Sequence, residues 1–351
     1  MRRGLMRWDA AELPADVLAD RIARLRTMMR RERFYAFLIY TKLVRPAAVN
    51  WLTGFTPYWS EGAVVVLPEG APIFATALSK RVSTWIKSTN TVSEIVNAPR
   101  PGNALGARLG AAKRVGVLEY DALPNALYED LAAAAPESEF VDASAAFAGL
   151  RRNIDAAERA LLTRADAIAR DALAMIDPAD ATDAGIIAGA VEQSARLAGA
   201  EEAYIAVAPD LAADQRLLRI TKPSPLGASF AVRASIAYKG CWVRRTRTFT
   251  RTETLSFARA DAWLDELATK LDLGKPLVDQ LTAWARGLGA TVQSWMAESC
   301  VGSYPLQVVA GSAVNETRPP SPGEFQVLTV ALTIDGMPWL GAAPVVLPSE
   351  R

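Results

Sequence analysis

In the first 150 residues, amphipathic helical patterns alternate with short apolar runs, and few folds accept such an alternation. Residues 13–40 read as an amphipathic helix that leads into a buried strand, Phe37–Tyr40. Further strands are predicted at 63–67, 73–75, 92–96 and 115–118, and a helix is predicted between Asp121 and Pro136. Helices and strands that follow one another in this way predict an α/β domain.

A second region of different character follows residue 150. It opens with a long helix, predicted over Asp155–Ile176, whose apolar residues lie on one face. Two more helices, an arginine-rich hairpin, a loop over 316–325 and a run of strands over Phe325–Leu347 complete it. The chain has 351 residues, of which 51% are hydrophobic, which is enough for two sizeable cores. We therefore predict two domains, residues 1–150 and 151–351.

The hairpin at 236–249, IAYKGCWVRRTRTF, turns at Lys239-Gly240 and carries an unusual group of three arginines, Arg244, Arg245 and Arg247. Because side chains alternate along a strand, Arg244 shares a face with Trp242 and Thr246. Arg245 and Arg247 share the other face. A two-residue turn also sets Arg233, on the preceding strand, opposite Thr246 and diagonal to Arg244.

Two neighbouring guanidinium groups need negative charge nearby. Carboxylates of the chain can supply it, and the candidates are Glu298, Asp335, Asp210 and Asp214. A bound anionic ligand can supply it instead, and the sequence leaves both alternatives open. The aromatic stretch TPYWSEG reads either as core or as a lip over a pocket. The candidate ligand-binding residues are therefore Arg233, Arg244, Arg247, Trp242, Tyr58 and Trp59.

The chain contains no histidine. This excludes Ser-His-Asp and Cys-His catalysis within one chain, together with metal sites that need imidazole. The two cysteines, Cys241 and Cys300, cannot build a disulfide framework and fit a reducing compartment, so we expect a cytoplasmic location. Without imidazole, proton transfer would fall to a carboxylate, and Glu298 is our candidate catalytic residue.

Charge is balanced over the whole chain. There are 39 lysines and arginines against 38 aspartates and glutamates, so no overall field draws the protein to nucleic acid or to an anionic membrane. No apolar run approaches the roughly 18 residues that a membrane span needs. Recognition of charge must therefore be local, and the hairpin is the place to expect it.

Three segments of the sequence form a recognisable set. They are NWLTGFTPYWSEGAVVVLPEG at 50–70, LRRNIDAAERALLTRA at 150–165 and YKGCWVRRTRTF at 238–249. These segments are similar to the start of the N-terminal domain, the linker helix and the glycine turn before an Arg-Thr strand of the creatinase, prolidase and aminopeptidase P (M24) family. The family's usual lysine in the linker is here Ile154. The resemblance implies a creatinase-like α/β N-terminal domain, a pita-bread α+β C-terminal domain and a homodimer.

The same resemblance places the family's five metal ligands on this chain. The two aspartates correspond to Arg233 and Arg244, the histidine to a position near Ser299, and the two glutamates to positions near Thr329 and Ala342. The resemblance thus implies that every ligand is replaced, so we expect no metal and no other cofactor. Creatinase itself works without metal, but it relies on a histidine that is absent here.

Two classes of function follow. The first is an M24 peptidase-like pseudoenzyme that binds a small anionic or peptidic ligand, or that serves as the partner of an active relative. The second is a metal-independent enzyme, creatinase-like, in which Arg233 and Arg244 hold the carboxylate of a small C–N substrate while Glu298 transfers a proton.

Overall fold

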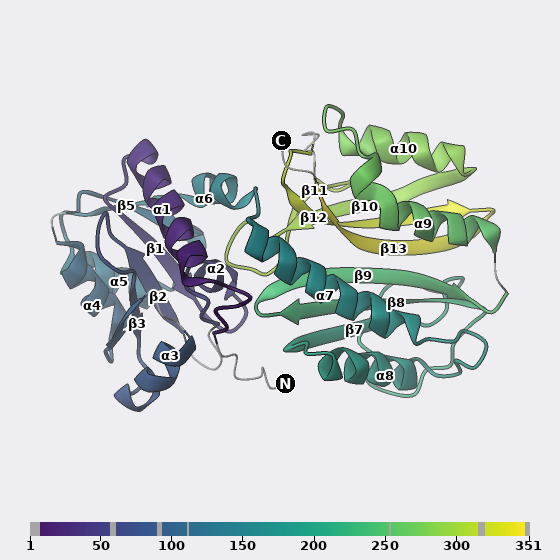
Figure 1. Cartoon of the computed structure of the whole chain (residues 1–351), viewed down its shortest axis with the longest axis horizontal. Helices are drawn as coiled ribbons and strands as arrows, with labels where there is room; N and C mark the ends of the chain where they lie inside the picture. The colour runs from purple at the N-terminus through teal and green to yellow at the C-terminus, as the bar shows by residue number, and fades with distance from the viewer. Residues whose placement is uncertain are drawn as a thin grey trace. The chain divides into compact units, whose positions relative to one another are not determined.

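The computed structural model describes residues 8–56, 61–89, 93–110, 112–252, 254–314 and 320–347. The chain divides into two compact units. The N-terminal unit contains residues 1–152 together with the short segment Cys300–Pro305, and the C-terminal unit contains 153–299 and 306–351. The return of Cys300–Pro305 to the N-terminal unit is a feature that the sequence pattern does not predict. Figure 1 shows the elements of both units.

The N-terminal unit is built on a six-stranded sheet in the order β4-β3-β2-β1-β5-β6. β2 runs antiparallel to its neighbours β1 and β3, whereas the β1–β5, β5–β6 and β3–β4 pairs are parallel. The elements, in chain order, are α1 (Ala15–Glu32), β1 (Ala36–Thr41), α2 (Ala47–Thr53), β2 (Gly62–Val66), β3 (Ile73–Thr76), η1 (Lys80–Val82), α3 (Ser83–Thr89), β4 (Glu94–Asn97), α4 (Pro101–Leu109), β5 (Arg114–Leu118), η2 (Tyr120–Ala122), α5 (Asn125–Ala134), β6 (Glu139–Asp142) and α6 (Ser144–Arg151).

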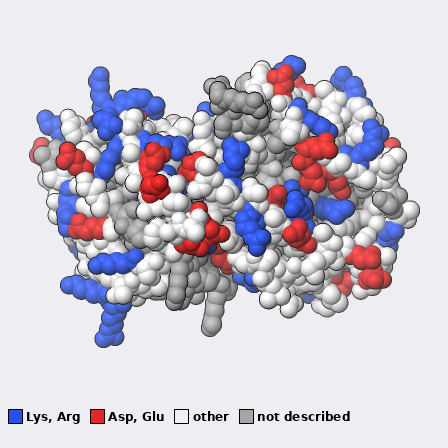
Figure 2. Space-filling model, viewed as in Figure 1, with Lys and Arg blue, Asp and Glu red and all other residues white. Residues whose placement is uncertain are grey.

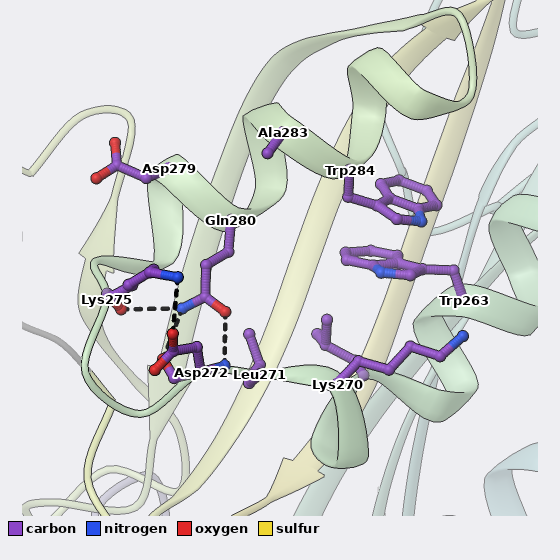
Figure 3. Close-up of a pocket in the computed structure, with 10 residues that line it drawn as sticks. Trp263, Lys270, Leu271, Asp272, Lys275, Asp279, Gln280, Ala283 and Trp284 are labelled. Atoms are coloured by element: carbon purple, nitrogen blue, oxygen red, sulfur yellow. Dashed lines mark hydrogen bonds and ion pairs between the residues drawn. The ribbon is translucent and has the colours of Figure 1, made fainter.

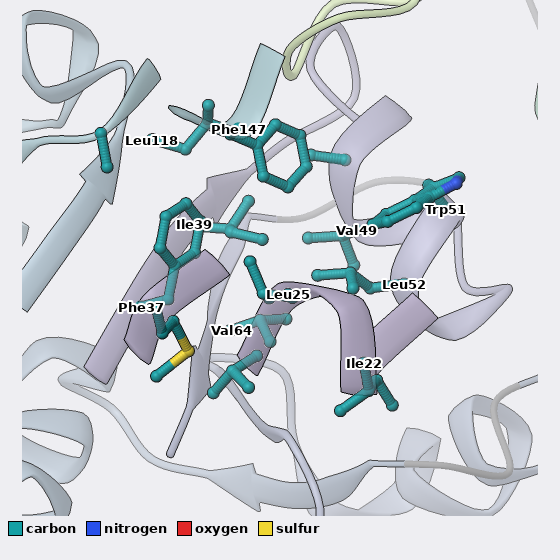
Figure 4. Packing of buried hydrophobic residues seen from close by; sticks show 14 of the residues in the cluster. Ile22, Leu25, Phe37, Ile39, Val49, Trp51, Leu52, Val64, Leu118 and Phe147 are labelled. Atoms are coloured by element: carbon teal, nitrogen blue, oxygen red, sulfur yellow. The ribbon is translucent and has the colours of Figure 1, made fainter. Parts of the chain in front are cut away.

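Helices cover both faces of this sheet, which explains why β1 is apolar at every position but its last. Phe37 and Ile39 belong to a core with residues of α1, α2 and α6, which Figure 4 shows from close by. Ala36 and Leu38 belong to a second core with residues of α4 and α5. The alternation predicted from the sequence is therefore confirmed as a three-layer α/β arrangement.

The helix predicted between Asp121 and Pro136 starts later than its sequence suggests. The segment at 120–122 forms a 3₁₀ turn, and α5 begins at Asn125 after Pro124. Proline fixes its own φ and suits the entry to a helix, so Pro124 sets this boundary more strongly than the capping potential of Asp121.

The C-terminal unit repeats one pattern twice: two helices followed by strands. The first half contains α7 (Ala156–Ala174), α8 (Ala184–Leu197), β7 (Glu202–Ala208), β8 (Ser229–Tyr238) and β9 (Cys241–Thr250). The second contains α9 (Leu255–Lys270), α10 (Leu277–Gly287), β10 (Ala290–Ser299), β11 (Gln307–Gly311), β12 (Phe325–Ile334) and β13 (Met337–Val346). Their strands form one antiparallel sheet in the order β11-β10-β12-β13-β9-β8-β7, which is the pita-bread arrangement.

The hairpin turn predicted at Lys239-Gly240 is confirmed. Tyr238 pairs with Cys241, and both turn residues have positive φ, 48° and 79°. This is the backbone of the two-residue hairpin turn whose twist matches that of the flanking strands, and glycine takes its second position without strain. Glu201 holds the turn by accepting hydrogen bonds from both turn N–H groups, each at 2.5 Å.

The segment Cys300–Pro305 is fixed to the N-terminal unit by a buried ion pair. Arg45, whose side chain is 2% exposed, pairs with Glu119, and Glu119 also accepts a 3.0 Å hydrogen bond from the Ser303 N–H. The Ala47 N–H donates to the Ser303 carbonyl at 2.9 Å. The guanidinium of Arg45 lies 5.4 Å from the ring centroid of Tyr304.

Candidate functional site

The register of the C-terminal sheet aligns several of the residues singled out by the sequence. Arg233 on β8 pairs with Thr246 on β9, and Thr246 pairs with Ala342 on β13. Ala342 pairs with Thr329 on β12. These four residues therefore form one continuous row across four strands, and Arg244 lies two residues before Thr246 on β9.

This row lies on the face of the sheet that the helices leave uncovered, which we call the open face. The intervening residues Leu328, Val330 and Ala343 belong to the core that contains residues of α9 and α10. Because side chains alternate, Thr329 and Ala342 point the other way. Paired residues point to the same side of a sheet, so Thr246 and Arg233 also point to the open face. Glu298 points to the open face as well, because its neighbour Ala297 lies in the helix-covered core.

Arg244 has its own counter-charge on the open face. It forms a salt bridge with Glu298 of β10, and its Nε donates to Ser235 Oγ of β8 at 3.2 Å. The side chains of Arg244 and Glu298 are only 19% and 7% exposed. Of the internal carboxylates expected to neutralise the arginines, Glu298 is thus the one that does so.

Arg233 is half-buried and makes no hydrogen bond or salt bridge to any residue that the structure describes. Burial lowers the pKa of the Arg233 guanidinium from its ordinary value, the positive charge of Arg244 lowers it further, and Glu298 opposes them. An arginine side chain nevertheless stays protonated in a protein. On the open face, the partly desolvated cation of Arg233 therefore lies near the Arg244–Glu298 ion pair, in which Glu298 already has a partner.

The other three carboxylates considered are engaged elsewhere. Asp210 accepts a hydrogen bond from the Ala212 N–H, and Asp214 pairs with Arg216. Asp335, in the turn between β12 and β13, accepts a hydrogen bond from Ser256 of α9. The first alternative from the sequence, internal neutralisation, thus holds for Arg244, whereas Arg233 forms no salt bridge with any acid among the described residues.

Arg245 and Arg247 lie on the opposite, helix-covered face. Arg245 contacts Asp166 of α7 and Asp265 of α9, the latter at 2.5 Å, and although burial opposes it these two acids raise the pKa of Arg245 overall. Arg247 lies 3.5 Å from Asp261 of α9. The geometry therefore separates Arg247 from the ligand-binding group in which the sequence placed it, because alternation directs it away from Arg233 and Arg244.

Aromatic side chains border the open face on one side of the arginines. Trp242 stacks on Tyr204 of β7 with ring centroids 5.6 Å apart and planes at 17°. Tyr204 pairs with Ser235, and so it shares a row with Arg244. Tyr204 was not singled out by the sequence, since only the pairing of β7 with β8 brings it here. Tyr58 and Trp59 lie outside the described residues.

At the other end of the open face an apolar cluster covers the strands. Ala208 and Ala231 pack with Leu340 and with Leu211, which comes from the loop after β7. The polar part of the open face is therefore bounded by this cluster on one side and by the Tyr204–Trp242 pair on the other.

The donor chemistry of the row does not fit a divalent metal. Arg233 and Arg244 are cations, Ala342 has no donor, and Thr329 carries only a neutral hydroxyl. Within the described part of the chain, no three acidic or cysteine side chains gather as a metal site would require. Near the position assigned to the histidine, Ser299 Oγ donates to the Phe325 carbonyl at 2.7 Å, and Cys300 Sγ lies 2.8 Å from the Pro305 carbonyl oxygen.

Two hollows are lined by residues that do not belong to the open face. One, of about 610 Å³, lies between α9 and α10, where Trp263 and Trp284 stack with centroids 3.5 Å apart, as Figure 3 shows. Its lysines, Lys270 and Lys275, are paired with acids of their own helices or loop. The other, of about 260 Å³, lies in the N-terminal unit beside Tyr40, whose pKa is raised by burial and by its hydrogen bond to Glu61.

In the view of Figure 2, lysines and arginines are interspersed with aspartates and glutamates on each unit. None of the helices in the described residues is both long and apolar enough to cross a membrane.

Comparison with known proteins agrees with this architecture. Residues 21–152 match the family model of the Creatinase/Prolidase N-terminal domain. A search of curated proteins finds no match. The whole chain is similar in structure to the prolidase from Pyrococcus horikoshii OT3, with a TM-score of 0.69 and 14% identity over 95% of this chain and 99% of that one.

Two further solved structures share the fold. The X-Pro aminopeptidase from Thermotoga maritima MSB8 has a TM-score of 0.70 and 15% identity over 92% of this chain and 95% of that one. The N-terminal domain of FACT complex subunit SPT16 from Eremothecium gossypii has a TM-score of 0.64 and 15% identity over 95% and 94%. At such identities the likeness establishes the fold, and the activity must be argued from the site.

Proposed function

We propose that this protein is an M24 peptidase-like pseudoenzyme that binds a small carboxylate-bearing ligand on the open face of its pita-bread domain. The observation that carries the proposal is the state of Arg233. Its guanidinium is half-buried and makes no hydrogen bond or salt bridge among the described residues. The neighbouring acid, Glu298, already forms a salt bridge with Arg244. A bound anion would supply the missing counter-charge.

The same two arginines oppose the metal chemistry of the peptidases that share this fold. A divalent ion about 4 Å from one guanidinium, at an effective dielectric constant near 20, is repelled by roughly 8 kcal/mol. Arginine cannot relieve this repulsion by losing its proton. On this proposal, replacement of the family's metal ligands has changed a cation site into an anion site.

A carboxylate suits the site better than a spherical anion does. The guanidinium is planar and presents paired N–H donors that match the two oxygens of a carboxylate. Hydrogen bonds to charged groups of this kind contribute roughly 1.5 to 3 kcal/mol each. Because Arg233 is partly withdrawn from water, the contact would lie at the favourable end of what a surface arginine achieves.

Isothermal titration and thermal-shift measurements with acetate, malonate and succinate test the proposal. We expect saturable binding and a rise in melting temperature for wild type, and loss of both in Arg233→Met, which keeps an apolar stem and removes the charge. Arg247→Met is the matched control because Arg247 lies on the other face of the same hairpin. Binding that is unchanged in Arg233→Met, or absent from wild type at low ionic strength, would refute the proposal.

The second function, a metal-independent C–N hydrolase or lyase, requires Glu298 to transfer a proton. Glu298 is the counter-ion of Arg244, so it would have to leave that salt bridge before it could act as a base. Carboxylates that also contain a C–N bond separate the two functions. Such a compound that binds and is recovered unchanged supports the pseudoenzyme, and turnover abolished by Glu298→Gln supports the enzyme.

A further inference from the structure

The open face offers a ligand more than a positive charge. Tyr204 lies diagonally across β7 and β8 from Arg233, because Arg233 pairs with Ala206, two residues further along β7. Diagonal neighbours of this kind have Cα atoms about 7 to 8 Å apart. One small molecule can therefore reach the guanidinium and the tyrosine ring together.

The residues between these two groups are short. Ala206 and Ser235 lie on the same face as Arg233, and both are at most 8% exposed. Short side chains at these two positions place no bulky group between the cation and the aromatic ring.

The aromatic pair is built so that one ring remains accessible. Trp242 is 8% exposed and lies against Tyr204, whereas Tyr204 is 37% exposed. Stacking on Trp242 restricts the tyrosine ring, and a restricted, partly exposed aromatic ring is a good surface for another planar group. A partly exposed aromatic ring beside an arginine that forms no salt bridge among the described residues points to a ligand that carries both an aromatic ring and an anionic group.

We infer that the acid bound at Arg233 is an arylalkanoic acid, with its aromatic ring one to three carbon atoms from the carboxylate and resting against Tyr204. This inference rests on the proposed function and narrows its ligand class. The carboxylate pairs with Arg233, the short chain spans the step from Arg233 to Tyr204, and the ring extends the stack formed by Tyr204 and Trp242.

Titrations of wild-type protein with acetate, phenylacetate, 3-phenylpropanoate and cyclohexylacetate test the inference. We expect the two aryl acids to bind about tenfold more tightly than acetate. The affinity of cyclohexylacetate should lie between that of acetate and that of the aryl acids. Tyr204→Leu keeps apolar bulk without the ring. In this variant the affinity for the aryl acids should fall to the affinity that wild type has for cyclohexylacetate. Tyr35→Leu, at an exposed tyrosine of the N-terminal unit, is the control and should bind like wild type.

The outcomes distinguish the inference from the proposed function. Equal affinity for acetate and phenylacetate, with both lost in Arg233→Met, would overturn the inference and keep the carboxylate site. A preference for aryl acids that persists in Tyr204→Leu would also overturn it. Aryl acids that bind equally to wild type and Arg233→Met would overturn both, since the ring would then bind without the arginine.

Discussion

Asp261 on α9 is a carboxylate whose ionised form the fold disfavours. Its side chain is 25% exposed, it accepts a 3.1 Å hydrogen bond from Trp339 Nε1, and Arg247 lies 3.5 Å away. Burial raises the pKa of Asp261 from 3.8 to about 6, although Arg247 and the Trp339 bond oppose the rise. The folded protein therefore binds this proton more tightly than the unfolded chain does.

We expect Asp261→Asn to stabilise the protein at pH 7.5. The rise in pKa from 3.8 to about 6 means that ionised Asp261 costs the folded state up to about 3 kcal/mol relative to the unfolded chain. The attraction of Arg247 is already contained in that pKa. Asparagine resembles the protonated carboxyl in size and keeps an acceptor for Trp339, so a gain of about 1.5 to 3 kcal/mol is expected.

The gain should depend on pH with a definite sign. The stability that protonated Asp261 contributes is fully present below pH 3.8 and is lost as the pH rises through about 6. The variant should therefore exceed wild type most above pH 7. The difference should shrink steadily below pH 6 and fall under about 1 kcal/mol near pH 4.

Urea unfolding followed by circular dichroism at pH 4, 5, 6 and 7.5 measures this difference, and equal urea dependence of the two proteins confirms that midpoints report stability. Asp265→Asn, one turn along the same helix, is the matched control: it removes a partner of Arg245 and should destabilise at pH 7.5. An Asp261→Asn variant less stable than wild type at pH 7.5, or a difference that does not change between pH 4 and 7.5, would refute the reasoning.

Three further outcomes are expected. Arg245→Met should lower the unfolding free energy by about 3 to 5 kcal/mol in urea titrations, because it leaves Asp166 largely buried without its cation. Arg247 has a 51% exposed side chain, so Arg247→Met should lower the unfolding free energy by under about 1 kcal/mol. Elemental analysis of dialysed, untagged protein should find no stoichiometric zinc, manganese, cobalt or iron; one equivalent or more would contradict the replacement of the metal ligands. Light scattering coupled to size exclusion should give twice the 37.7 kDa chain mass, and a monomer at micromolar concentration would contradict the expected dimer.

The sequence predicts local features of this fold well where a pattern has one physical cause. The apolar run around Phe37 indicates a strand buried on both faces, and Lys239-Gly240 indicates a tight hairpin turn, because positive φ at two adjacent positions suits few other sequences. Alternation along β9 also separates Arg244 from Arg245, and the contacts of Asp166 and Glu298 follow that separation.

Long-range pairing is what the sequence does not reveal. Tyr204 reaches the open face only because β7 pairs with β8, and Glu298 meets Arg244 across intervening strands. The partner of Arg247, Asp261, comes from a helix that begins after the hairpin ends. Each contact depends on the register of the whole sheet, for which no single segment carries a signal.

The segment Cys300–Pro305 has a consequence for how the chain is assembled during its synthesis. At roughly 5 to 20 residues per second, about 8 to 30 s separate residue 152 from residue 305 as the chain is made. Throughout that interval Glu119 lacks the Ser303 N–H, and Arg45 lacks the Tyr304 ring that lies against it in the finished fold. The first unit to emerge from the ribosome therefore cannot be completed until the chain has reached residue 305, and a fragment cut at residue 152 would lack the segment Cys300–Pro305 that belongs to it.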